Sequence, residues 1–276
     1  MTRAVLTGLA ELGGFFELTQ PAGTDAVPWS VLLADDPLAA RIAAVRGALA
    51  AGSGLSVDTV DPKVAVSALQ VGLVSRLWSV ALAGAVLHRW VPDLSSANLL
   101  ASPGHGGPVP LALSDPTRGY AVTGTEAGAG PGAGPGADPD ATTTAAEIIA
   151  RVVVRGSLRD LDDACARVGR TPQRALLSNA SSSLVGAARV LATRRPPAGP
   201  QAWALARLLL QDPDLRPGGR ALGRAGLPTG VGGGMERPEE AFLRGGCCLF
   251  DRLPGHGLCP DCVRAEHRPE LVTPGH

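Results

Sequence analysis

Four of the chain's five cysteines lie in one short stretch near the C-terminus, and their spacing restricts this end of the fold more than any other feature. Cys247, Cys248, Cys259 and Cys262 form the pattern C-C-x10-C-x2-C. Glycine and proline make the segment between the pairs a tight loop that can direct both pairs to one point. Four thiolates so placed can enclose a metal centre, and soft sulfur ligands favour an iron–sulfur cluster or tetrahedral zinc.

The adjacent pair Cys247 and Cys248 favours the two-iron cluster over zinc. Structural zinc sites usually space each cysteine pair as C-x2-4-C. Neighbouring side chains diverge on a strand, so gripping one zinc ion would require a bent backbone. A [2Fe–2S] cluster offers two irons and accepts ligands from different directions. Zinc, disulfides and free thiols remain the alternatives.

The same stretch resembles the C-terminal motif of the FhuF-like ferric-siderophore reductase family, whose [2Fe–2S] cluster is held by this cysteine pattern. The four cysteines match the family's ligand positions one for one. Four further residues fit the family loop, which typically reads CCLYYRLP: Leu249, Arg252, Leu253 and Pro254. A second likeness to actinobacterial-type members of the FhuF-like group lies far away, in the phrases SRLWS at 75–79 and VPDL at 91–94.

The sequence departs from the family loop at four positions. Phe250 and Asp251 replace its paired aromatic residues, and Pro260 replaces the glycine of C-G-D-C. Gly246 stands where a serine or threonine often precedes the first cysteine. These changes leave the ligands intact and alter the hydrogen bonding around them, which influences the cluster potential.

The resemblance implies a ferric-siderophore reductase, an oxidoreductase that passes one electron from the cluster to the Fe(III) chelate and releases Fe(II). No flavin or nicotinamide site is recognisable, so a partner such as a ferredoxin or a reduced flavin must supply electrons. The alternatives are a [2Fe–2S] electron-transfer or redox-sensing protein and an interaction module stapled by zinc.

Beyond the cluster no catalytic residue is expected, but five side chains are candidates for contacts with the cluster or the substrate. Arg244 and Arg252 flank the cysteine pair and could raise the potential, attract an anionic siderophore, or serve surface solubility. His256 lies in the loop, either near the cluster or simply exposed. Arg76 is either buried against backbone carbonyls or a carboxylate, or faces the siderophore. Asn179 either belongs to a small-residue helix contact or donates to a ligand or the cluster loop.

Composition limits the binding partners and the cellular compartment that we expect for this protein. The formal net charge is zero, with 25 basic and 25 acidic residues, so nucleic acid is not an implied partner. Glu11 interrupts the N-terminal apolar run before a signal-peptide core is complete. Without an export signal, a reducing, cytoplasmic location is expected, which favours metal over disulfide. The apolar stretch 62–90 contains Arg76 and reads as a buried helix rather than a transmembrane segment.

Hydrophobic periodicity predicts an α+β fold that is predominantly helical, with a few short strands and a C-terminal cysteine-rich loop. A helix break is expected near Gly72 or Gly84. A strand is expected over 15–19 and a hairpin at a sheet edge over 109–122. The predicted helices span 3–12, 36–52, 62–90, 142–154, 157–168, 172–193 and 201–210.

Two regions follow from these patterns. Residues 1–215 form a helix-rich FhuF-like domain, interrupted by a flexible Gly/Pro loop at about 125–141. Residues 216–276 form a flexible approach, with one turn expected over 238–242, followed by the cluster-binding segment.

Overall fold

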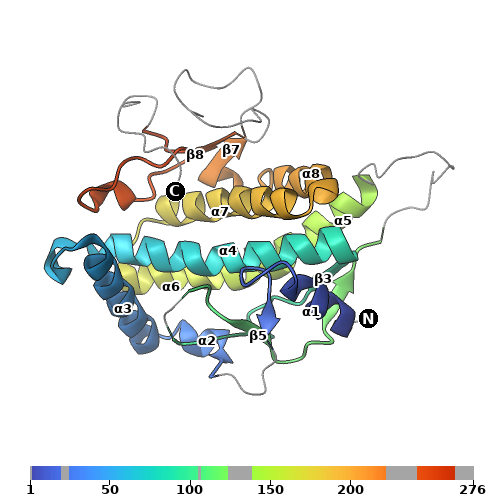
Figure 1. The fold of residues 1–276 in the computed structure, drawn as a ribbon, viewed down its shortest axis with the longest axis horizontal. Coiled ribbons are helices and arrows are strands. Elements are labelled where there is room, and N and C mark those ends of the chain that lie inside the picture. The colour runs from blue at the N-terminus through green and yellow to red at the C-terminus, as the bar shows by residue number, and fades with distance from the viewer. Residues whose placement is uncertain (1, 20–24, 105–106, 124–138, 222–240, 265–276) are drawn as a thin grey trace.

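The structure, a computed structural model, describes residues 2–19, 25–104, 107–123, 139–221 and 241–264. It is a predominantly helical α+β protein with short strands, as the sequence predicts. The helix α4 (Pro62–His88) runs through the middle, and other helices pack around it (Figure 1). These helices are α1 (Thr2–Ala10), α2 (Trp29–Leu32), α3 (Asp35–Ser53), α5 (Pro139–Ile149), α6 (Arg159–Gly169), α7 (Gln173–Arg194) and α8 (Gly199–Leu209).

Local chemistry at both ends explains the bounds of α4. The Asp61 carboxylate accepts a hydrogen bond from the Lys63 amide at 2.9 Å, and Pro62 occupies the first turn. At the other end Arg89 takes a left-handed conformation with φ 49° and closes the helix. Most side chains between these ends are buried, which places α4 in the core of the protein.

The predicted break in α4 near Gly72 or Gly84 is wrong, because the helix is continuous from Pro62 to His88. A Cβ atom on Gly84 would lie 2.6 Å from the Trp90 carbonyl oxygen. Glycine at this position therefore lets the chain that follows the helix pack directly against it. Gly72 has no such neighbour within 4 Å.

Among the described residues, α4 alone has the length and apolar composition that a membrane span requires. Within its most apolar window, 67% of the residues are buried inside the protein. Neighbouring helices thus cover the apolar surface of α4 that a lipid would otherwise contact.

The strands are short and form three small sheets. The largest sheet has the order β1-β5-β4-β2, in which β1 is parallel to β5 and the other pairs are antiparallel. Antiparallel pairs β3–β6 and β7–β8 complete the set. The strands are β1 (Leu18–Thr19), β2 (Val27–Pro28), β3 (Trp90–Pro92), β4 (Leu99–Ala101), β5 (Leu111–Leu113), β6 (Gly119–Ala121), β7 (Gly219–Ala221) and β8 (Phe242–Arg244).

The predicted hairpin over 109–122 is also wrong. Its turn exists, with the Arg118 amide donating to the Asp115 carbonyl, but β5 and β6 pair with different partners. All three residues of β5 are buried, and β5 lies between β1 and β4 rather than at an edge. β6 instead pairs with β3, directly after α4.

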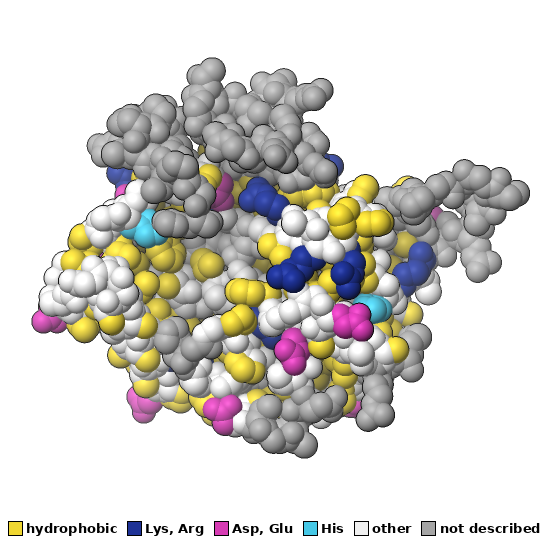
Figure 2. All heavy atoms as spheres, viewed as in Figure 1, with side chains coloured by type: hydrophobic (Ala, Val, Ile, Leu, Met, Phe, Trp, Pro, Cys, Tyr) yellow, Lys and Arg dark blue, Asp and Glu magenta, His cyan; other side chains and the backbone are white. Residues whose placement is uncertain are grey.

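The remaining segments agree with the sequence in part. Residues 150–158 form a widened π-helical turn that links α5 to α6, with Gly156 at non-helical angles. Helix α5 begins at Pro139, within the end of the predicted loop 125–141, whose earlier part lies outside the described residues. A turn is predicted over 238–242, but β8 starts at Phe242, the last residue of that range. Residues 238–240 lie outside the described part of the chain. Basic, acidic and apolar side chains are mixed on the face shown in Figure 2.

Candidate metal centre

The four predicted cysteine ligands lie in a loop that follows β8 and packs beside α7 (Figure 1). Two glycines allow this close approach. A Cβ atom on Gly246 would lie 2.8 Å from the Arg174 carbonyl oxygen at the start of α7, and one on Gly245 would lie 2.3 Å from the Pro217 carbonyl. A serine or threonine, frequent in the family at position 246, would therefore require α7 or the loop to shift.

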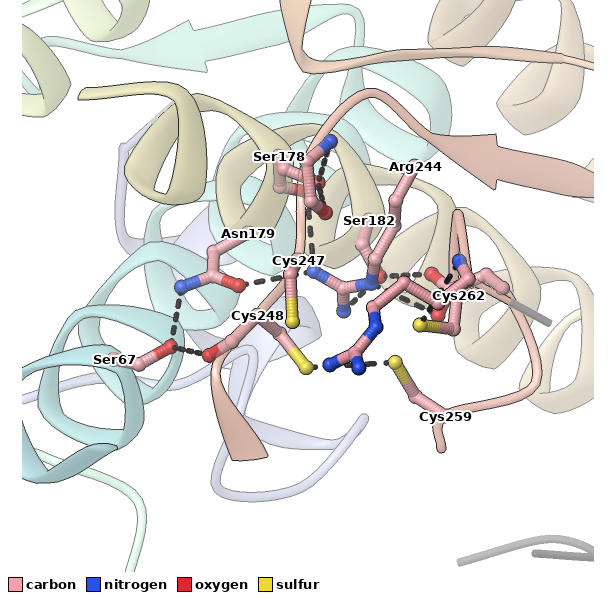
Figure 3. A network of polar contacts seen from close by, with 12 residues as sticks. Ser67, Ser178, Asn179, Ser182, Arg244, Cys247, Cys248, Cys259 and Cys262 are labelled. Carbon is pink, nitrogen blue, oxygen red and sulfur yellow. Dashed lines mark hydrogen bonds and ion pairs between the residues drawn. The ribbon is translucent and has the colours of Figure 1, made fainter. Parts of the chain in front are cut away.

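The cysteine sulfurs of the two pairs meet in this loop. Cys248 Sγ lies 3.5 Å from Cys259 Sγ, so one member of each pair is in contact with the other (Figure 3). Cys248 and Cys262 are buried, whereas Cys247 and Cys259 are half-buried. One side of the site is therefore closer to solvent than the other.

The donor set fits a two-iron cluster, because contacts join Cys247 to Cys248, Cys248 to Cys259 and Cys259 to Cys262. Structural zinc needs four donors around one point. A [2Fe–2S] cluster needs only two thiolates at each iron, and Cys247, Cys248, Cys259 and Cys262 would provide them.

Backbone amides already donate to two of the sulfurs. The Leu249 amide lies 3.3 Å from Cys247 Sγ, and the Arg264 amide lies 3.4 Å from Cys262 Sγ. Leu249 reaches this geometry with φ 71°, which is unusual for a residue with a branched side chain. Its side chain is anchored among Val60, Val64 and Leu253, and this packing offsets the backbone strain.

The surroundings favour a thiolate at Cys248. Hydrogen bonds from the Cys247 and Cys259 thiols, together with the positive charge of Arg244, lower the pKa of Cys248 to about 2. The same contact with Cys248, with burial, raises the pKa of Cys247. Thiolate is the form of cysteine that binds metal.

Arg244 is largely buried, with 10% of its side chain exposed, and it connects the two cysteine pairs. Its Nε donates to Asp261 Oδ1 at 2.9 Å, and Asp261 stands between Cys259 and Cys262. The Arg244 amide also donates to the Asp261 carbonyl at 3.0 Å. The guanidinium thus connects the strand before the first pair to the loop of the second (Figure 3).

Asn179 on α7 connects this arginine to the cysteine backbone through Ser67, and among the described residues its amide donates to Ser67 on α4 rather than to the cluster loop. Arg244 Nη1 donates to Asn179 Oδ1 at 2.9 Å, and Asn179 Nδ2 donates to Ser67 Oγ at 2.7 Å. Ser67, on α4, donates in turn to the Cys248 carbonyl at 2.6 Å. A chain of buried polar groups therefore links both central helices to the loop (Figure 3).

Sequence reasoning missed three members of this network. Sequence analysis singled out neither Ser67 nor Ser182, which lie within predicted helices, and Asp261 entered it only through the family pattern C-G-D-C. Ser182 accepts from Arg244 Nη2 at 2.7 Å and donates to Asp261 at 2.5 Å. One sequence feature could have indicated this network. Arg244 precedes the first cysteine pair, Asp261 lies within the second, and the two side chains carry opposite charges.

Arg252 and His256 lie in the turn between the cysteine pairs. Arg252 Nη1 forms an ion pair with Asp61 at 2.8 Å, and about half of its side chain is exposed. This contact ties the loop to the residue that caps α4. His256 lies against the Phe250 ring, with centroids 5.5 Å apart, and its ring is half-buried.

Arg76 lies in the buried environment that sequence analysis considered, away from the cysteine loop. Its guanidinium donates to the backbone carbonyls of Val109, at 2.8 Å, and of Gly14 and Glu17. Only 1% of its surface is exposed. The fifth cysteine, Cys165, is a fully buried core thiol on α6.

The fold and the site together define a helix-rich protein with a C-terminal iron–sulfur loop. Residues 244–264 match the model of the FhuF 2Fe-2S C-terminal domain, which confirms the resemblance for this segment and gives it a [2Fe–2S] cluster as cofactor. The matched segment runs from Arg244 to Arg264 and contains all four cysteines of the motif and Asp261. No curated protein and no solved structure matches the chain.

Proposed function

We propose that this protein is a ferric-siderophore reductase of the cytoplasm, which transfers one electron to the iron of a ferric chelate. The observation that carries the proposal is the FhuF 2Fe-2S match over the four cysteines, in a loop whose sulfurs come together from both pairs. The matched domain supports iron–sulfur redox chemistry, and the siderophore as substrate is the further step proposed.

The chemistry requires little from the protein beyond holding and positioning the cluster. When bound, the [2Fe–2S] cluster exchanges one electron, which is what the reduction of Fe(III) to Fe(II) needs. Hard anionic oxygen donors hold ferric iron tightly and ferrous iron weakly, so the chelate opens after reduction. No acid–base side chain is needed for this release.

The residues around the cysteines control exposure and charge. Cys247 and Cys259 are half-buried and mark the side from which a bulky chelate can approach. The amides of Leu249 and Arg264, and the buried Arg244, place positive partial or full charge near the sulfurs. Such hydrogen bonds and positive charges raise a cluster potential, whereas the Asp251 carboxylate, 3.3 Å from Cys247 Sγ, acts in the opposite direction. A ferredoxin or a reduced flavin is the proposed electron donor.

Anaerobic stopped-flow spectroscopy tests the proposal directly. The reduced protein is mixed with ferric hydroxamate, catecholate or mixed chelates while cluster absorbance and trapped Fe(II) are followed. We expect fast reoxidation by at least one class, with one Fe(II) formed for each cluster oxidised. Reoxidation by carrier proteins, with none by any chelate, would leave an electron-transfer protein instead.

A pair of cysteine variants supplies the matched control. Cys259→Ser removes a ligand and is expected to abolish the visible and EPR signals of the cluster. Cys165→Ala changes a buried thiol outside the loop and is expected to keep both signals. Zinc in the native protein, without iron or sulfide, would contradict the proposal entirely.

A further inference from the structure

Arg41 and Arg76 are buried in the described helical body, and they differ in how they are satisfied. Arg76 donates from Nε, Nη1 and Nη2 to backbone carbonyls. Arg41, on α3, donates only from Nη1, to the Ser102 carbonyl at 2.7 Å. Its Nε and Nη2 are buried and have no hydrogen-bond partner among the residues that the structure describes.

An unpaired guanidinium is costly in such a place. A buried charge is normally paired, since removing it from water without a partner disfavours the folded state. Burial alone lowers the pKa of Arg41, with no acidic group acting in the opposite direction. Arginine nevertheless stays protonated in proteins. The structure therefore holds a buried positive charge that lacks a counter-ion among the described residues.

The two unpartnered nitrogens have a particular geometry. Nε and Nη2 lie along the same edge of the planar guanidinium group, so that Nε–H and one Nη2–H form a fork of parallel N–H groups. Such a fork matches the two oxygens of a carboxylate, and the resulting charge-assisted pair is stronger than neutral hydrogen bonds. A planar oxyanion is therefore the partner that would best satisfy these two N–H groups of Arg41.

Arg41 also lines a cavity of about 410 Å³ between α2, α3 and the chain after β4. This volume lies in the range of small-molecule sites, about 300–1,000 Å³. The walls are otherwise apolar, including Val27, Val31, Leu32, Pro37 and Pro103. Val31 leaves 47% of its surface exposed beside this cavity. Apolar walls with one buried cation suit a ligand that has a hydrocarbon body and one acidic head.

We propose that the cavity beside Arg41 binds a small carboxylate with an apolar body, whose two oxygens accept hydrogen bonds from Arg41 Nε and Nη2. The cavity is lined by residues of α2 and of the adjoining half of α3. In Figure 1 these elements lie on the opposite side of α4 from β8, which leads into the cysteine loop. The cavity is therefore separate from the metal centre, and the proposal does not depend on the siderophore reductase activity.

Calorimetric titration of the full chain with octanoate tests this site, with octanol and octylamine as comparison ligands. Octanoate is expected to bind with one site per chain, and octanol and octylamine at least about tenfold more weakly. Arg41→Met keeps the apolar stem and removes the charge, so octanoate should bind at least about tenfold more weakly. This variant should also unfold at the same or a higher temperature, because an unpaired cation is gone.

Two further variants make the result decisive. Ala44→Trp fills the rim of the cavity without changing Arg41 and should weaken octanoate binding to the same degree. Arg46→Met, on the same helix but with its Nε bonded to the Val60 carbonyl, should bind octanoate like the unmodified protein. The proposal is overturned if octanoate shows no binding at about 1 mM, or if octanol binds equally well. Unchanged binding in Ala44→Trp would also overturn it, even if Arg41→Met failed to fold.

Discussion

Arg244 carries its charge inside the protein, with 10% of its side chain exposed, and donates to Asp261, Asn179 and Ser182. Because these partners belong to α7 and to the second cysteine pair, the position of one side chain affects both. The half-exposed Arg252 forms a comparable pair with Asp61 at the edge of the same loop. The two arginines thus allow a comparison of a buried and an exposed ion pair.

Arg244→Met is expected to lower the free energy of unfolding by about 3 kcal/mol, because it leaves a largely buried Asp261 without its partner. It should also speed loss of the cluster, since the second cysteine pair is no longer held. Urea unfolding and the decay of visible absorbance measure the two effects. Arg252→Met is the control, with a cost below about 1 kcal/mol. Equal costs would show that the buried network does not hold the loop.

A second residue-scale prediction concerns Asp162, which is buried on α6 and accepts a hydrogen bond from Gln70 Nε2 at 2.9 Å. Burial raises the pKa of this carboxyl to about 7 from 3.8. The folded protein therefore keeps a proton that the unfolded chain releases at lower pH. This stabilisation is complete below the unfolded pKa of 3.8 and is lost as the pH rises to about 7.

In Asp162→Asn, the neutral amide resembles the protonated carboxyl, so the variant does not lose this stability as the pH rises. The difference in unfolding free energy, variant minus unmodified protein, should therefore increase between about pH 4 and pH 7 and level off above that. Urea unfolding at several pH values measures it. Asp163→Asn changes an exposed neighbour and should show no such increase. If this difference in unfolding free energy did not change with pH, the Asp162 carboxyl would be ionised in the folded protein.

At the scale of elements, the helices follow from local sequence signals and the strands do not. The bounds of α3, α4 and α7 lie close to those predicted, because long apolar periods and Asp–Pro or Thr–Pro starts act over neighbouring residues, as does the glycine that ends α3. Strands of two or three residues show no readable alternation. Their pairing depends on distant partners, as β5 shows by joining β1 and β4 instead of β6.

The two glycines of α4 provide an element-scale test of why the helix is unbroken. Gly84→Ala places a methyl group 2.6 Å from the Trp90 carbonyl and is expected to destabilise the protein by about 2 kcal/mol. Gly72→Ala meets no atom within 4 Å and is expected to stabilise it by about 0.5 kcal/mol. Thermal and urea unfolding compare them. A stabilising Gly84→Ala would mean that β3 does not pack against the helix as described.

At the scale of the whole molecule, the cysteine loop is attached to a core that does not include it. The main core joins α1 to α8 around α4, while Leu249 and Leu253 pack in a smaller cluster with Ala50, Val60 and Val64. The helical body should therefore persist when the cluster is removed, and the loop should loosen.

Removal of the cluster by an iron chelator under reducing conditions tests this arrangement. The far-UV circular dichroism of the helices is expected to change little, because none of the four motif cysteines lies in an α-helix. Trypsin should cleave after Arg252 faster in the apoprotein, as the loop loses its metal support. The cluster-free Arg252→Gln variant lacks this cleavage site and serves as control. Loss of the helical signal together with the cluster would show that the domain folds only around the metal.

The sequence alone determined the cofactor class and the main helices and predicted the four cysteines as ligands, because each depends on residue type and on spacing within a short segment. The tertiary structure decided what surrounds them. Ser67, Asn179 and Asp261 come from three distant parts of the chain, and no local pattern relates them. Only packing shows that Arg244 and Arg76 are enclosed and bonded, because burial depends on which segments cover a side chain.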